Sequence, residues 1–191
     1  DNFIKKFLVS NDFQNNIYNI LAALTVMNIY INIFQLSKKI FLNFKVPPGR
    51  GDFSRIKINE KKIYLIDESY NSNPLSLKSA ILNYDKINSK NSKKYLLLGD
   101  MLELGANSKK LHRSIAPVIN KTKIDKVFVK GIKVLSMFDK VIKSKRGRIL
   151  QNKSQITDLL ENELHDNDYL MIKASNATGF SEITKVLKGE N

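Results

Sequence analysis

Three short polar segments, each directly after a run of apolar residues, contain the side chains best suited to chemistry. They are residues 67–74 (DESYNSNP), 98–105 (LGDMLELG) and 173–176 (KASN). A carboxylate where a buried run ends can accept hydrogen bonds from ribose hydroxyls, and a lysine there can receive a carboxylate or a phosphate. The three segments are therefore candidate parts of a ligand site.

Asp67 and Asn73 also fit a purely structural role. Asx side chains commonly organise loops and cap helices, and Asn73 stands directly before Pro74, which suits the first turn of a helix. On spacing alone the structural interpretation is slightly favoured. The choice between loop organisation and ligand binding stays open at this level.

The polar segments need a framework, and the apolar pattern predicts a sheet. Short runs rich in Ile, Leu and Val are expected to form strands at residues 54–58, 63–66, 95–98, 126–129, 147–150 and 169–172. Helical spacing of apolar residues predicts helices at 74–87, 109–121, 132–143, 153–164 and 180–187. This alternation predicts a doubly wound, largely parallel, Rossmann-like α/β sheet whose first two strands form an antiparallel hairpin. Ligands of such sheets bind at the carboxyl ends of the strands.

The first 46 residues follow a different pattern. Apolar residues recur at helical spacing in 15–31 and again in 33–44, which predicts an all-helical piece. Pro47, Pro48 and Gly49 then forbid a continued helix and mark a boundary. We expect two domains, residues 1–46 and 47–191.

The net charge of +14 raises nucleic-acid binding as an alternative function. The basic residues are 27 Lys and only 5 Arg, whereas recognition of bases and phosphates favours the planar guanidinium of Arg. They are also scattered along the chain in doublets. A solvated basic surface is therefore favoured, and a basic nucleic-acid-binding α/β module is the alternative.

Several other classes are disfavoured. The chain has no Cys and two separate His residues, so no metal site is expected. Neither GxGxxG nor GxxxxGK[ST] occurs, which argues against a nicotinamide-binding dehydrogenase and implies that another domain holds most of any nucleotide. No run of 18 apolar residues predicts a membrane span and nothing marks export, so a cytoplasmic location is expected.

The polar segments resemble motifs of the Mur ligase family, in its branch that joins D-alanyl-D-alanine to UDP-N-acetylmuramoyl tripeptide. Residues 67–74 resemble the motif DDSYNANP, and residues 98–105 match LGDMLELG, at the expected separation. Residues 48–50 (PGR) resemble the opening of the family's C-terminal domain. Residues 16–23 (NIYNILAA) resemble the HNxxNALAA helix of its central ATPase domain. The resemblance covers nearly the whole chain.

Two departures from the family pattern concern single residues. Asn15 replaces a His that precedes the first Asn of the helix motif. Ala174 and Asn176 replace the Gly and Arg of KGSR, so a guanidinium contact to the substrate carboxylate cannot be carried over. The family's UDP-binding domain, its phosphate-binding loop and its metal-binding positions have no counterpart in this sequence.

A sister branch, which adds a diamino acid, would carry a DNPR-like signature after the strand expected at 126–129. Here Lys130, Gly131 and Ile132 follow that strand instead. The sequence therefore favours the dipeptide-adding branch.

The resemblance implies an ATP-dependent peptide ligase of peptidoglycan precursor synthesis that also uses Mg²⁺. Its substrates would be UDP-N-acetylmuramoyl tripeptide and D-alanyl-D-alanine, with no nucleic-acid partner and no partner subunit. The missing central domain would hold Mg²⁺ and most of ATP, so this chain alone would have no catalytic residue and no activity.

The resemblance also implies roles for particular residues. Arg50 would contact the ATP phosphates, Asp67 the ribose, and Asn16 and Asn19 the adenine end, although both Asn residues also fit a helix surface. The residues expected to face D-alanyl-D-alanine are Asn71, Asn73, Lys173 and Ser175. Met101, His112 and Tyr70 are expected to be packing or loop residues.

Overall fold

The computed structural model describes residues 4–9, 17–43, 47–89 and 91–190, and it forms two compact units, Asp1–Pro47 and Pro48–Asn191. In the first unit, α1 (Ile17–Tyr30) has no charged residue. Only Ile20 and Leu24 of this helix are buried. The apolar side chains packed against these two are Phe7, Val9, Ile33, Leu36 and Phe41.

The helix expected at residues 33–44 is wrong. Only the 3-10 turn η2 (Ile33–Gln35) forms, after which Leu36 is extended. Side chains before and after this turn accept backbone hydrogen bonds that a helix would otherwise use: Asn32 Oδ1 accepts from Phe34 N, and Ser37 Oγ accepts from Lys39 N. The following segment then pairs with the start of the chain through a parallel bridge between Val9 and Phe41, so the first unit is not all-helical.

The second unit contains the predicted sheet, with strand order β1-β2-β6-β3-β4-β5. The strands are β1 (Asp52–Ile58), β2 (Lys61–Glu68), β3 (Lys94–Gly99), β4 (Lys126–Lys130), β5 (Arg146–Ile149) and β6 (Tyr169–Lys173). The β1–β2 pair is antiparallel and every other pair is parallel. The doubly wound, largely parallel α/β fold is therefore confirmed.

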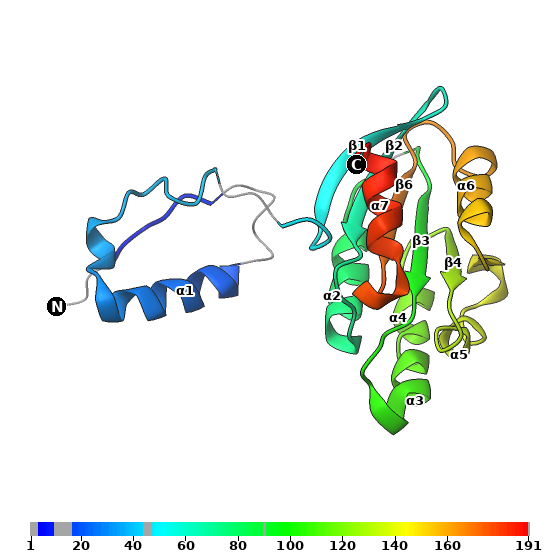
Figure 1. Ribbon diagram of the computed structural model, residues 1–191, viewed down its shortest axis with the longest axis horizontal. Helices are drawn as coiled ribbons and strands as arrows, with labels where there is room; N and C mark the ends of the chain where they lie inside the picture. The colour runs from blue at the N-terminus through cyan, green and yellow to red at the C-terminus, as the bar shows by residue number, and fades with distance from the viewer. Residues whose placement is uncertain (1–3, 10–16, 44–46, 90, 191) are drawn as a thin grey trace. The chain divides into compact units, whose positions relative to one another are not determined.

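Helices cover both faces of the sheet (Figure 1), because the side chains of the central strands β2, β6, β3 and β4 alternate between two apolar clusters. One face packs against α2 (Pro74–Asp85), α4 (Ala116–Asn120) and α5 (Leu135–Phe138). The other packs against α6 (Lys153–Asn162) and α7 (Phe180–Lys188), which is drawn in red in front of the sheet. This three-layer arrangement places the carboxyl ends of β2, β6 and β3 side by side.

Two predicted helices differ from the structure. The helix expected at 109–121 is split into α3 (Ser108–Arg113) and α4, because Pro117 has no N–H to continue the helical ladder. The helix expected at 132–143 is reduced to α5, since the side chain of Asn120 accepts from Ile142 N and donates to Lys140 O. The remaining 3-10 turns are η3 (Gly105–Asn107), η4 (Lys143–Lys145) and η5 (Asn176–Thr178).

Candidate functional site

The carboxyl ends of β2 and β6 gather most of the residues predicted to bind ligands. Those that lie in or next to these strand ends are Arg50, Asp67, Asn71, Asn73, Lys173 and Ser175. Asn19 lies on the exposed side of α1 in the first unit, and Asn16 lies outside the described residues. The structure therefore unites the second-unit residues and does not place the two Asn residues against them.

The turn that carries Arg50 is fastened to the segment after β2. Gly49 N donates to Asp52 Oδ1 over 2.7 Å, and Gly49 O accepts from Tyr70 N over 3.0 Å. Gly49 has φ +74°, and a Cβ atom there would lie 2.8 Å from Tyr70 N, so only glycine suits this position. Because the turn is held on both sides, Arg50 has a defined place beside Tyr70.

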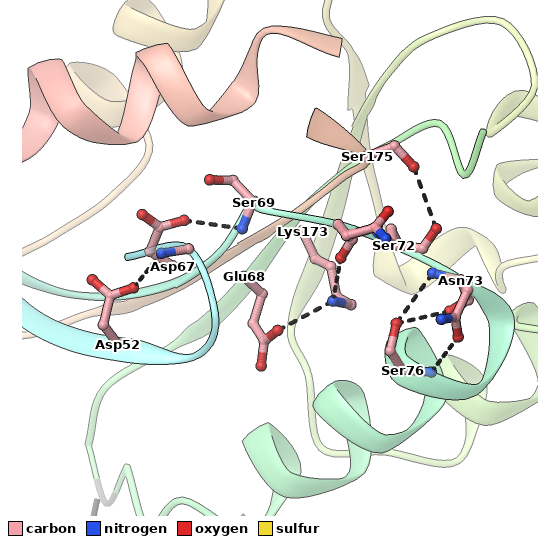
Figure 2. A network of polar contacts seen from close by, with 11 residues as sticks. Asp52, Asp67, Glu68, Ser69, Ser72, Asn73, Ser76, Lys173 and Ser175 are labelled. Atoms are coloured by element: carbon pink, nitrogen blue, oxygen red, sulfur yellow. Dashed lines mark hydrogen bonds and ion pairs between the residues drawn. The ribbon is translucent and has the colours of Figure 1, made fainter. Parts of the chain in front are cut away.

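Asp67 is buried on the face of β2 that packs against α7, with a side chain 3% exposed (Figure 2). Its Oδ1 accepts from Ser69 N over 3.0 Å, and its Oδ2 accepts from Lys188 Nζ over 2.7 Å. Lys188 also pairs with Asp52. Both carboxylate oxygens of Asp67 are thus used within the chain.

The charges of this contact stabilise each other. Burial raises the pKa of Asp67, but hydrogen bonds from Lys188 and Ser69 outweigh it, and the net pKa lies below its ordinary value. Burial likewise lowers the pKa of Lys188, while hydrogen bonds to Asp52 and Asp67 outweigh it and leave the pKa raised. Each group therefore favours the charged form of its partner.

Glu68 lies on the opposite face of the same strand and pairs with Lys173. The Lys173 side chain is only 2% exposed, and its Nζ donates to Glu68 Oε2 over 3.1 Å and to Asn71 O over 2.9 Å. Figure 2 shows the ammonium group of Lys173 joined to the carboxylate of Glu68. Glu68 itself is 24% exposed, and its Oε1 lies against Gly51, next to Arg50. Of the two adjacent acids, Glu68 is the one that a ligand can approach.

Sequence reasoning missed Glu68, although a signal for it existed. Side chains alternate along a strand, and Ile63 and Leu65 face the α6–α7 layer. Asp67 has the same parity, whereas Glu68 has the parity of Ile66 and projects to the other face. Strand parity could therefore have separated the two acids.

The loop that leads into α2 is built from its own side chains. Asn73 caps the helix: its Oδ1 accepts from Ser76 N over 2.8 Å, and its N–H donates to Ser76 Oγ over 3.1 Å. Ser175 Oγ donates to Ser72 O over 3.3 Å and accepts from Leu102 N over 3.0 Å. Ser175 thus ties the end of β6 to two other loops.

The segment after β3 is held by a carboxylate and an imidazole. Asp100 accepts from Val134 N and Ile132 N over 2.8 and 3.2 Å. A Cβ atom at Gly131 would lie 2.4 Å from Asp100 Oδ1, so this close approach requires glycine. His112 is buried, and its Nε2 accepts from Met101 N over 3.0 Å. These contacts fix the shape of the loop. His112 is a buried packing residue that holds the backbone of Met101 in place.

This arrangement can bind a polyhydroxylated, phosphate-bearing ligand. Arg50 is exposed, and among the described residues its guanidinium makes no hydrogen bond or ion pair, so its donors are available to an anion. Glu68 Oε1 offers an acceptor for hydroxyl groups beside it. A nucleoside phosphate carries both complementary groups, and the donor set of this site fits it.

Residues 53–176 match the family described as Mur ligase, glutamate ligase domain, and the chain therefore belongs to the Mur ligase family. The UDP-N-acetylmuramoyl-tripeptide–D-alanyl-D-alanine ligase of Rickettsia prowazekii (strain Madrid E) is 27% identical over 92% of this chain. The enzyme of the same name from Buchnera aphidicola subsp. Baizongia pistaciae is 32% identical over 91% of it. The resemblance stated from the motifs is thus confirmed.

A solved structure shares the fold. The MurF ligase of Thermotoga maritima in complex with ADP aligns with a TM-score of 0.70 and 23% identity, over 93% of this chain and 38% of that one. This chain spans 37% of the Rickettsia relative and 36% of the Buchnera relative. It therefore corresponds to little more than a third of these proteins.

The comparisons also decide between the two functions weighed from the sequence. They point to a ligase family and give no support to a basic nucleic-acid-binding module. Among the described residues, no helix combines the length and apolarity needed to cross a membrane.

Proposed function

We propose that this chain belongs to an ATP-dependent ligase that joins D-alanyl-D-alanine to UDP-N-acetylmuramoyl tripeptide, and that it is the part of the enzyme that closes over ATP. The observation that carries the proposal is the position of Arg50 next to Gly51, which lies against Glu68 Oε1 at the carboxyl end of the sheet, in a chain of the Mur ligase family. The similarity to ligases of that name over more than nine-tenths of the chain supports the choice of substrates.

At the nucleotide end, Arg50 binds the ATP phosphates through its unpaired guanidinium donors. The ribose is assigned to the acidic pair at the end of β2. Asp67, predicted from the sequence, would first have to release Lys188 or Ser69, whereas Glu68 can accept a hydroxyl with Oε1 while Oε2 keeps Lys173. Asn16 and Asn19 remain assigned to the adenine end.

At the dipeptide end, the proposed residues hold the loop between β2 and α2 in place through hydrogen bonds. Lys173 and Ser175 connect β6 to the residues after β2, and Asn73 caps α2. Asn71, the fourth of this group, has an exposed side chain that accepts from Ser72 N over 2.8 Å. The proposal assigns this loop to D-alanyl-D-alanine.

The proposed reaction has two steps. The γ-phosphoryl group of ATP is transferred to the tripeptide carboxylate and ADP leaves. The amine of the dipeptide then attacks the acyl carbon, phosphate leaves, and the nitrogen loses a proton. Residues of this chain align ATP with the acceptor and exclude water, since phosphoryl transfer depends on positioning and charge stabilisation. We assign Mg²⁺, and the phosphate-binding loop, to the rest of a monomeric cytoplasmic enzyme.

Residues 1–46 are proposed to be the helical end of the central ATPase domain, and residues 47–191 the C-terminal domain. An uncharged helix that is apolar all round is stable when neighbouring structure covers it. Several large apolar side chains of α1 are exposed in the first unit alone: Ile17, Tyr18, Leu21, Val26, Ile29 and Tyr30.

The proposal is tested in the full-length protein that contains this chain. We expect that protein to release phosphate from ATP only when tripeptide and dipeptide are both present, and the 191-residue chain to show no ligation. Arg50→Ala should raise the Michaelis constant for ATP about tenfold or more, since a hydrogen bond to a charged group contributes about 1.5–3 kcal/mol. An unchanged ATP constant would remove Arg50 from the site, and salt-dependent DNA binding by the chain would revive the alternative function.

A further inference from the structure

We infer that Tyr70 is a positioning residue for Arg50: its ring holds the guanidinium flat and ready for the phosphates of the nucleotide. This inference rests on the nucleotide role of Arg50 proposed above. It gives a task to a side chain that the motif alone presented as a loop residue.

The geometry of the pair is that of a cation stacked on an aromatic face. Arg50 Cζ lies 4.1 Å from the centroid of the Tyr70 ring. Guanidinium groups are attracted to such faces by the ring quadrupole and stack well because both groups are planar. The backbone brings the two residues together, since Tyr70 N donates to Gly49 O beside Arg50.

Two other arginines lie over aromatic rings, and they differ from Arg50 in their remaining contacts. Arg55 lies 5.4 Å from the Tyr64 ring and donates to Asn167. Arg146 is packed over a ring in the same way and donates to backbone carbonyls. Within the described parts of the chain, Arg50 makes the closest of the three ring contacts and keeps its N–H donors for a ligand.

Tyr70 has no other visible task that would explain an aromatic residue. Tyr70 is 46% exposed, so it contributes little to the core. Its hydroxyl has no hydrogen bond to any described residue. Among the described residues, the cation–π contact with Arg50 is thus the specific interaction that the Tyr70 side chain makes. Arg side chains lose much rotamer freedom when a ligand orders them, and a ring that restricts the guanidinium beforehand reduces that cost.

The kinetic test uses full-length ligase with Tyr70→Leu, which removes the ring, and Tyr70→Phe, which keeps it. Tyr70→Leu should raise the Michaelis constant for ATP about two- to fivefold, the range expected for an exposed cation–π contact, with little change in kcat. Tyr70→Phe should behave like the unaltered enzyme. Phe53→Leu is the matched control, because it also removes an exposed ring from the same unit, one that stacks on Tyr64.

A double substitution separates action through Arg50 from direct action on the nucleotide. In an Arg50→Ala background, Tyr70→Leu should cause no further rise in the ATP constant. A further two- to fivefold rise there would mean that the ring contacts the nucleotide itself, and it would overturn the inference. Equal effects of Tyr70→Phe and Tyr70→Leu would overturn it as well, because the hydroxyl would then be the active group.

The stack can also be observed without ATP. In the 191-residue chain with ¹⁵N-labelled arginine, the Nε–H signal of Arg50, assigned with Arg50→Lys, should show an upfield ring-current shift. The shift should persist in Tyr70→Phe and disappear in Tyr70→Leu. Absence of the shift in the unaltered chain, or its loss without any change in the ATP constant, contradicts the inference. If Arg50→Ala leaves the ATP constant unchanged while the shift is present, the nucleotide role of Arg50 has failed and the inference fails with it.

Discussion

Two lysine–carboxylate contacts stand back to back at the end of β2, and they differ in what surrounds them. On the α7 face, Lys188 pairs with both Asp67 and Asp52. The side chains of Lys188 and Asp67 are almost entirely buried. On the other face, Lys173 is buried but its partner Glu68 is partly open to solvent. Adjacent residues of one strand thus belong to two different environments.

The difference shows that charge and position in a motif do not by themselves define a ligand contact. The α7-side contact, Asp67 with Lys188 and Asp52, is closed: every carboxylate oxygen of Asp67 has a partner within the chain. The open contact leaves Glu68 Oε1 against Gly51, the residue after Arg50, without a hydrogen bond from any described residue. We therefore expect substitutions in the closed contact to change mainly stability, and substitutions in the open one to change mainly ATP binding.

The largest effect is expected from Lys188→Met, which keeps the apolar stem and removes the ammonium group. Two carboxylates would then face each other with one of them buried, and breaking a buried pair in this way costs about 3–5 kcal/mol. Urea unfolding of the 191-residue chain, followed by circular dichroism, measures the loss. Lys185→Met is the control, because Lys185 is an exposed lysine of the same helix. A decrease in the free energy of unfolding of less than about 1 kcal/mol, similar to that of the control, would show that the closed contact does not stabilise the fold.

The second prediction sets the two acids against each other in the full-length ligase. Glu68→Gln should raise the Michaelis constant for ATP roughly ten- to a hundredfold, since a hydrogen bond to a charged acceptor contributes about 1.5–3 kcal/mol. Asp67→Asn should lower the melting temperature with little change in that constant. The ribose role that the sequence assigns to Asp67 predicts the opposite pattern. Steady-state kinetics with each substrate varied in turn, together with melting curves of both variants, decide between them.

Most of the fold could be predicted because it depends on local apolar patterning. All six strands were predicted from their runs of Ile, Leu and Val. The antiparallel hairpin follows from the short connection between β1 and β2, and the parallel direction of the other strands follows from the long, helix-containing connections between them. Two of the regions that failed depend on contacts distant in sequence: Phe41 pairs with Val9, and residues 132–143 are interrupted by the side chain of Asn120. The third, residues 109–121, is split by Pro117, which is a local signal.

The candidate site was predicted in location but not in detail. The motifs placed Arg50, Asp67 and Lys173 at one edge of the sheet, and the structure brings their segments together. Which carboxylate stays accessible depends on α7, because Lys188 of this helix pairs with Asp67 although it lies more than a hundred residues later in the sequence. The stack of Tyr70 on Arg50 likewise depends on a backbone contact that no local pattern encodes.

The third prediction concerns pH and applies to the closed contact. The pKa of Asp67 is lowered in the folded chain, so its contribution is present above its ordinary pKa of 3.8 and is lost as pH falls through the lower folded value. The pKa of Lys188 is raised, so its contribution is present below 10.5 and is lost as pH rises beyond it. In Lys188→Met, Asp67 is buried beside Asp52 without a cation, which raises its pKa, so the stability advantage of the unaltered chain should narrow as pH falls from neutrality and should narrow further below pH 3.8. Urea unfolding of both chains at a series of pH values measures the difference, and an advantage that is as large at pH 3 as at pH 7 would show that it does not come from the charges of this contact.

The smallest effect is expected from two serines, one on each side of the comparison. Ser69, beside the closed contact, has its hydroxyl 3.2 Å from Thr184 Oγ1, and both groups are buried. Ser72, beside the open contact, has a buried hydroxyl for which no described residue provides a hydrogen bond. An intramolecular hydrogen bond contributes about 0.5–1.5 kcal/mol, whereas a buried hydroxyl without a partner is a cost. Ser69→Ala should thus destabilise the chain by about 1 kcal/mol, and Ser72→Ala should leave its stability unchanged or slightly increased. The two variants remove the same oxygen from neighbouring buried positions, so each is the control for the other in urea unfolding. A loss at Ser72 as large as that at Ser69 would mean that the Ser72 hydroxyl is bonded after all, and that the loop on the open side is as closed as its counterpart.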